Sequence, residues 1–210
     1  MIHVITCDPF GVVRRGIREF LAEAVDVRLS GEAASAEELK RMLRTTQCDV
    51  LLLALALPGR SGLDVLADLV EAGSTVKVLV YSGEPEQQYA VRCLRAGAYG
   101  FLSKASDPRL LVTAVRMVGQ GQKYLSPEAT QLLADTVARP DAEAPAHQLL
   151  SNRELETLVR IASGKTMADI AREFMLSPKT VNVYRMRVRE KLHLNNDAAL
   201  TAYAIRNQLI

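Results

Sequence analysis

The sequence of 210 residues contains no tryptophan, and only 5% of its residues are aromatic. This scarcity argues against an aromatic cage or a sugar-stacking cleft. No apolar run approaches the roughly 18 to 20 residues that a membrane-spanning helix needs, and the first residues lack the basic start of a secretory signal. With 49% hydrophobic and 24% charged residues, the composition is that of a globular protein, which we expect to be cytoplasmic.

Cysteine and histidine are both rare. The three cysteines, an odd number without CxxC spacing, lie in apolar surroundings: Cys7, Cys48 and Cys93. We interpret them as core residues in a reducing compartment, which excludes a disulfide framework and a cysteine zinc site. The three histidines are far apart and show no metal-ligand spacing: His3, His147 and His193. The sequence therefore predicts no metal centre.

Catalytic motifs are missing as well. Residues 59–62 do not form a nucleophile elbow, although they contain a serine between glycines. Gly119 and Gly121 follow an expected helix and lack the third glycine of a dinucleotide-binding loop. We therefore expect a protein that is not an enzyme and needs no cofactor.

What the sequence does contain is an uneven distribution of charge. Residues 1–147 contain 16 lysines and arginines against 18 acidic residues, whereas residues 148–210 contain 10 against 6. Residues 137–147 include two prolines and show no apolar periodicity, which is typical of an exposed linker. We predict a first domain at residues 1–122, a linker at residues 123–147 that starts as a helix, and a second domain at residues 148–210.

The first domain alternates short apolar runs with longer segments of helical period, such as residues 12–23 and 37–44. Five strands are expected, at residues 2–6, 27–30, 49–55, 76–81 and 99–102. Strands that alternate with helices form a parallel sheet covered on both faces. The sequence thus predicts an α/β fold with a doubly wound, five-stranded parallel sheet. In such sheets, ligands bind beyond the carboxyl ends of the strands.

Four residues stand at these carboxyl ends: Asp8, Ala54, Ser82 and Lys104. Their layout, together with residues 49–63 and 96–104, resembles the receiver domain of bacterial two-component response regulators, which implies a flavodoxin-like or CheY-like fold. In that family an acidic pair after the first strand holds Mg²⁺, and an aspartate at the end of the third strand accepts a phosphoryl group. A serine or threonine and a lysine contact the phosphate. The resemblance places Asp8, Ser82 and Lys104 in this pocket.

The sequence departs from the receiver pattern at the phosphoacceptor and in the metal site. Ala54 has no nucleophilic oxygen and Pro9 cannot ligate a metal, so Asp8 is at most a weak Mg²⁺ ligand. We therefore expect no phosphorylation at residue 54. Ala54 fits either a natural degenerate receiver or an engineered aspartate-to-alanine block. Pro9 favours the natural origin, because an engineered block needs only one change.

The second domain contains the start signals of three successive helices. Ser151 and Glu154 form a capping-box pattern, Thr166 begins a second helix, and Ser177 followed by Pro178 begins a third. Two short helices, a tight turn and a third helix make a helix-turn-helix.

The third helix is the most basic in the chain. At about 100° per residue, its inward face contains Val181, Tyr184, Val188 and Leu192. The outward face mixes apolar and basic side chains, which is typical of helices that contact thymine methyls and base edges in the major groove. The candidate DNA-binding residues are Lys179, Thr180, Asn182, Val183, Arg185, Met186, Arg187 and Arg189. A solvated charged face without a ligand is the alternative.

Residues 150–154, 170–171 and 176–181 resemble the LuxR-type DNA-binding domain, and its combination with a receiver resembles the NarL/FixJ class of response regulators. The resemblance implies double-stranded DNA as a partner, with the third helix in the major groove. It also implies a homodimer, and a sensor histidine kinase or another regulatory protein as a further partner. The last helix resembles the family's dimerisation helix, unless its apolar residues merely close the small core. The candidate dimer contacts are Leu200, Tyr203 and Ala204.

Two functions stay open at this point. The first is a sequence-specific transcriptional regulator whose arginines at positions 185 and 189 contact phosphates beside the groove. The second is a protein-interaction or docking module of a signalling pathway that does not bind DNA. DNA binding through several lysines and arginines weakens steeply with salt, whereas an apolar protein interface does not.

Overall fold

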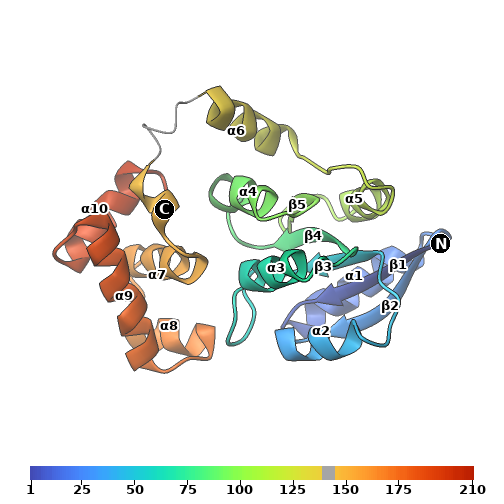
Figure 1. The fold of residues 1–210 in the computed structure, drawn as a ribbon, viewed down its shortest axis with the longest axis horizontal. Helices are drawn as coiled ribbons and strands as arrows, with labels where there is room; N and C mark the ends of the chain where they lie inside the picture. Colours follow the sequence, from blue (N-terminus) through green and yellow to red (C-terminus); the bar gives the residue numbers. More distant parts are fainter. Residues whose placement is uncertain (139–144) are drawn as a thin grey trace. The chain divides into compact units, whose positions relative to one another are not determined.

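The computed structural model describes residues 1–138 and 145–210. The chain divides into two units, Met1–Thr136 and Val137–Ile210. Figure 1 shows that the strands belong to the first unit, whereas the described part of the second unit is helical. None of the described helices is both long enough and apolar enough to cross a membrane.

The first unit contains a five-stranded parallel sheet with the strand order β2-β1-β3-β4-β5. The strands are β1 (Ile2–Cys7), β2 (Val27–Ala33), β3 (Val50–Leu53), β4 (Lys77–Ser82) and β5 (Gly100–Ser103). Every residue of β3 is buried, because this central strand is covered on both faces. The predicted doubly wound α/β fold is confirmed.

Five helices flank this sheet: α1 (Gly11–Ala22), α2 (Ala36–Met42), α3 (Gly62–Glu71), α4 (Glu86–Arg95) and α5 (Leu110–Gly119). Ile17 and Leu21 of α1 share one hydrophobic core with Leu111 and Val115 of α5 and with Leu52 of β3. The remaining helices cover the opposite face, as right-handed crossovers require for this strand order. Burial raises the pKa of the Cys7 thiol to about 12, which suits the core role predicted for it.

The segment after α5 packs on the sheet. Tyr124 pairs with Gly100 of β5 and donates its backbone N–H to the carbonyl of Tyr99 over 2.9 Å. Lys123 Nζ donates to the carbonyl of Ala98 over 2.7 Å. Helix α6 (Pro127–Ala138) follows. The boundary expected after residue 122 therefore falls inside the first unit, and residues 139–144 of the expected linker lie outside the described residues.

The second unit consists of η2 (Ala146–Leu149), α7 (Asn152–Ala162), α8 (Met167–Phe174), α9 (Pro178–Leu192) and α10 (Asp197–Arg206). All three predicted helix starts are confirmed. Ser151 and Thr166 each form a capping box, and the Ser177 side chain accepts the N–H of Thr180 with Pro178 in the first turn. Met175 ends α8 in the left-handed region at φ 52°. This sharp turn lets α9 leave α8 as a helix-turn-helix requires.

Candidate receiver pocket and nucleic-acid interface

The carboxyl ends of β1 and β5 bring Asp8 and Lys104 together. Lys104 Nζ forms an ion pair with Asp8 Oδ2, and the backbone N–H of Phe10 donates to Asp8 Oδ1 over 2.9 Å. Lys104 also lies 5.8 Å from the ring centre of Tyr81. Asp8 is only 1% exposed, so Lys104 and the Phe10 N–H replace the water that would otherwise solvate its carboxylate. Both carboxylate oxygens are thus satisfied by the protein itself.

Ala54 and Ser82 stand at the ends of the two neighbouring strands. Ala54 is buried, and its N–H donates to the carbonyl of Cys7 over 2.9 Å. The Ser82 hydroxyl accepts the N–H of Glu84 over 3.1 Å, which fixes its side chain at the start of the following loop. A methyl group occupies the position where a phosphoacceptor would present an oxygen.

The Mg²⁺ that the receiver pattern implies does not fit these residues. Magnesium prefers octahedral coordination by hard oxygens, usually including more than one ligand from the protein. Asp8 offers a single carboxylate with both oxygens engaged, and Pro9 and Ala54 have no side-chain oxygen. Within the described residues, no group of three or more metal-ligating side chains is present.

The outward face of α9 exposes polar, basic and apolar side chains. Val181, Val188 and Leu192 are buried and Tyr184 is half-buried, so the predicted inward face is confirmed. On the opposite side, Val183 is 40% exposed and Met186 is 60% exposed. The other exposed candidates are Lys179, Asn182 and Arg187, whereas Thr180 is half-buried. Asn182 Nδ2 lies 3.9 Å from Met186 Sδ, so these two side chains form one surface.

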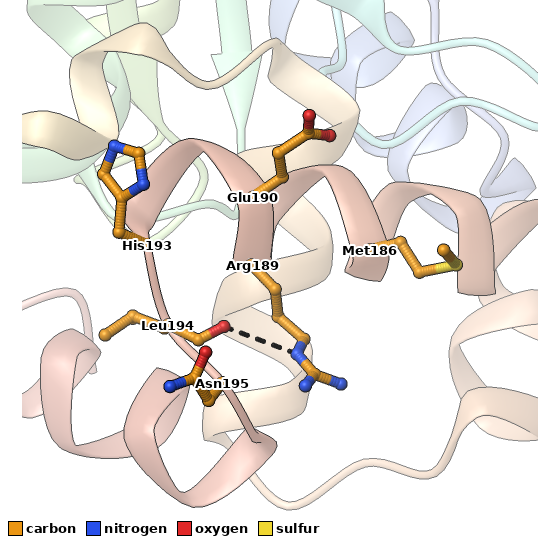
Figure 2. A pocket seen from close by; sticks show the side chains of 6 residues that line it. All are labelled: Met186, Arg189, Glu190, His193, Leu194 and Asn195. Carbon is orange, nitrogen blue, oxygen red and sulfur yellow. Dashed lines mark hydrogen bonds between the residues drawn. The ribbon is translucent and has the colours of Figure 1, made fainter.

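Two candidate arginines of α9 have partners in the chain segment that follows the helix. Arg185 Nε lies 3.2 Å from Oδ1 of Asp197, the first residue of α10. Arg189 Nε donates to the carbonyl of Leu194 over 3.5 Å, as Figure 2 shows. Beside Arg189 and Met186 lies an open hollow of about 530 Å³. Both arginines lie on one flank of the outward face.

The predicted dimer contacts in α10 lie in different places. Leu200 and Ala204 are fully buried where α10 packs against α7, so they close the core of this unit and offer no surface to a second copy. Tyr203 is half-buried, and its hydroxyl accepts the backbone N–H of His147 over 3.0 Å. The large apolar side chain that α10 exposes is Ile205, at 58%. Helical periodicity identified an apolar face, and that face points inward.

The sequence matches two families of known proteins. Residues 4–116 match the response regulator receiver domain, and residues 148–204 match the bacterial regulatory proteins of the luxR family. Response regulator UvrY of Escherichia coli (strain K12) is 34% identical over 209 residues, covering 100% of this chain and 96% of its own. Response regulator GacA of Pseudomonas aeruginosa is 33% identical over 210 residues, covering 100% and 98%. This chain is a LuxR-type response regulator.

Two solved structures have the same architecture as this response regulator. Response regulator ChrA, from a heme-sensing two-component system, is 27% identical, with 100% of this chain and 98% of ChrA covered and a TM-score of 0.52. RcsB from Salmonella enterica serovar Typhimurium, bound to promoter rprA, is 23% identical, with 96% and 97% covered and a TM-score of 0.67. The RcsB likeness concerns the fold alone.

Helix α6 lies between the two matched regions of this response regulator, so neither family model covers it.

Sequence reasoning missed the contacts that hold α9 in the second unit. Lys191 Nζ donates to Glu154 Oε2 over 2.7 Å, which ties the end of α9 to the capping box of α7. Burial raises the pKa of Glu154, but hydrogen bonds from Lys191 and Ser151 outweigh it and hold this pKa below its ordinary value. Glu154 already belongs to the capping-box pattern in the sequence, but no sequence signal indicates that Lys191 is its partner.

Proposed function

We propose that this response regulator is a sequence-specific transcriptional regulator that binds DNA as a homodimer, with a receiver that takes no phosphoryl group at residue 54. The observation that carries the proposal is the exposed face of α9. Asn182, Val183 and Met186 lie at its centre, with basic side chains around them. A helix of this composition on a helix-turn-helix suits major-groove recognition.

The chemistry of this face favours base contacts over a merely solvated surface. Asparagine can bind adenine through two hydrogen bonds, and exposed apolar side chains contact thymine methyls. Val183 and Met186 would otherwise be unfavourably hydrated in the middle of a basic surface. Lys179 and Arg187 are exposed at its margins, where phosphate contacts fix the position of a groove-bound helix.

Dimerisation is supported by the paired half-sites that helix-turn-helix proteins commonly bind on DNA. A recognition module of this size buries little DNA surface, and helix-turn-helix proteins commonly bind two half-sites one helical turn apart. One structure of RcsB contains two dimers bound to two parallel DNAs. We assign the dimer contact in this chain to the exposed side of α10 around Ile205, since Leu200 and Ala204 lie in the core.

The pocket's own residues support phosphate independence. Ala54 offers no nucleophile, and Lys104 is already neutralised by Asp8. A phosphoryl group transferred from a sensor kinase would therefore have neither an acceptor nor a free cation in this pocket.

A salt titration on a selected duplex tests DNA binding against the docking-module alternative. Four basic residues of α9 are in the candidate set, at positions 179, 185, 187 and 189. If each replaces one phosphate counterion, the logarithm of the binding constant falls with a slope of about −3 to −4 per copy. Footprinting of the same duplex should show two related half-sites. A flat salt dependence, with retention by a protein partner alone, would favour the docking module.

A further inference from the structure

Two arginines on one flank of α9 are anchored by the same short segment. Arg185 and Arg189 lie one helical turn apart. Arg189 Nε donates a hydrogen bond, whereas Arg185 Nε makes an ion-pair contact over 3.2 Å without a hydrogen bond. The anchoring groups are the carboxylate of Asp197 and the carbonyl of Leu194, which lie within residues 194–197. Figure 2 shows Arg189 extending toward this segment, while Glu190 points from the other side of the helix.

The pair of Arg185 and Asp197 is only partly buried. Arg185 Nε and Asp197 Oδ1 are shielded from solvent and form no hydrogen bond, so an ion-pair contact over 3.2 Å holds them, while the two side chains are 28% and 41% exposed. The exposure of Arg185 therefore lies on the other atoms of its side chain. Asp197 is itself well fixed, since it follows the N-cap Asn196 and lies at the positive end of the α10 dipole.

A guanidinium whose Nε lies in an ion-pair contact still has its two terminal NH₂ groups for another acceptor. These four N–H bonds form the planar fork that binds phosphate oxygens. Fixing the fork in advance reduces the side-chain entropy that is lost on binding. Arg185 lies beside Asn182 on α9, so its exposed end borders the groove-facing surface.

We propose that Asp197 is a positioning residue for DNA binding, which holds Arg185 so that its terminal nitrogens meet a backbone phosphate. The inference rests on the proposed function and adds to it a role for the start of α10. It predicts that neutralising this acidic residue lowers the affinity for DNA. An aspartate close to DNA repels phosphate, so its neutralisation should strengthen binding, unless the carboxylate acts through an arginine.

The experiment is a double-mutant cycle on the full chain with a duplex selected from a random library. With Arg185 present, Asp197→Asn should weaken binding about threefold to tenfold, because the guanidinium is no longer fixed before binding. In the Arg185→Ala background the same change should leave affinity unchanged or raise it slightly. Arg185→Lys keeps the charge without the fork and should also remove the effect of Asp197→Asn.

Glu190→Gln is the matched control, because Glu190 is an exposed acid on the same helix. It should raise affinity by the same small factor with or without Arg185. The salt slope should become shallower by about 0.9 in Arg185→Ala and by a part of that amount in Asp197→Asn, a change that a purely structural role would not produce. Thermal unfolding of each variant checks that the unit is folded.

Two outcomes overturn the inference alone. If Asp197→Asn strengthens binding more when Arg185 is present, the aspartate competes with phosphate for the arginine. If its effect is equal in both backgrounds, the two residues are not coupled in binding. A wild-type chain that selects no duplex overturns the proposed function, and this inference with it.

Discussion

Each of the two units contains a basic side chain paired with an aspartate, and the two aspartates differ strongly in their exposure to solvent. Asp8 in the receiver pocket is 1% exposed, and both of its oxygens bind donors of the protein. Asp197 in the second unit has a side chain that is 41% exposed, and its partner Arg185 is 28% exposed. The aspartate of the first pair is closed to solvent although Lys104 is 20% exposed, whereas the aspartate of the second pair is open to solvent.

The comparison indicates that a basic residue can occupy the position of a family's ligand-binding residue without being available to bind a ligand. Lys104 occupies the position of the phosphate-binding lysine in the receiver pattern, yet its ammonium group forms an ion pair with Asp8. Arg185 has an acidic partner too, which lies 3.2 Å from its Nε. The receiver thus keeps its fold with a neutralised site, while α9 keeps a surface suited to a polyanion.

The largest expected effect is the complete absence of phosphoryl transfer to the closed pocket. Incubation with acetyl phosphate and Mg²⁺ should leave the mass of the chain unchanged, because Ala54 cannot act as a nucleophile. The variant Ala54→Asp combined with Pro9→Asp should gain one labile phosphoryl group under the same conditions. Mass spectrometry distinguishes the two, and a stable adduct of the wild type on Asp8 or Ser82 would contradict the prediction.

Removing the acid of the Asp8–Lys104 pair should have a clear effect on the free energy of unfolding. Asp8→Ala leaves Lys104 without its acid. Because the Lys104 side chain is 20% exposed, the cost should be lower than for a fully buried pair, at about 1.5 to 3 kcal/mol for a lost hydrogen bond to a charged group. Urea denaturation should therefore show a fall of this size in the free energy of unfolding. The double variant Asp8→Asn with Lys104→Met replaces the whole charged pair and should recover most of the loss. A loss below about 1 kcal/mol in the single variant would mean that solvent, not burial, governs this pair.

The sequence predicted those features that depend on neighbours along the chain. The continuous apolar run at residues 50–55 favours a strand covered on both faces, because a one-sided strand would alternate, and β3 occupies Val50–Leu53 within it. Ser151, Thr166 and Ser177 identified three helix starts, since a cap bonds to an amide only three residues away. The four strand-end positions followed from the strands themselves.

What the sequence could not predict depends on contacts between elements. Periodicity grouped Leu200 and Ala204 on one face of α10, but it does not say whether a core or a second copy covers that face. The partners of Arg185 and Lys191 come from α10 and α7, and only the packing of these helices brings them together. The same holds for Tyr124, whose pairing with β5 extended the first unit beyond the expected boundary.

In the second unit, mutations can distinguish the role of the buried side chains of α10 from the role of its exposed side chains. Leu200→Ala should lower the free energy of unfolding by about 2 to 5 kcal/mol, because it leaves a cavity against α7. Ile205→Glu should change stability by no more than about 0.5 kcal/mol, yet it should weaken the homodimer. Analytical ultracentrifugation on DNA-bound and free protein measures the second effect. If Leu200→Ala instead leaves stability intact and abolishes dimerisation, the core assignment is wrong.

Base recognition should show a smaller effect, confined to the open surface of α9. Asn182→Ala and Val183→Ala should each change the preferred base at one position, at roughly 1 to 3 kcal/mol per lost contact. Arg189→Ala is the control, and it should weaken binding to all sequences alike with a salt slope shallower by about 0.9. Binding to a library of operator point mutants at two salt concentrations measures both. If the Asn182 variant loses affinity uniformly while the Arg189 variant changes preference, α9 docks in another rotation.

The smallest expected effect concerns acid stability at the pair of Lys191 and Glu154. Because the folded state holds the pKa of Glu154 below its ordinary value, the pair stabilises the fold above the unfolded pKa of about 4.3. That contribution is lost as the pH falls through the folded pKa, since the native carboxylate then takes up a proton. Lys191 is 40% exposed, so the effect should not exceed about 1 kcal/mol. Urea denaturation at pH 6 and pH 3 should show a smaller loss in Glu154→Gln than in the wild type, and an equal loss would assign acid sensitivity to other carboxylates.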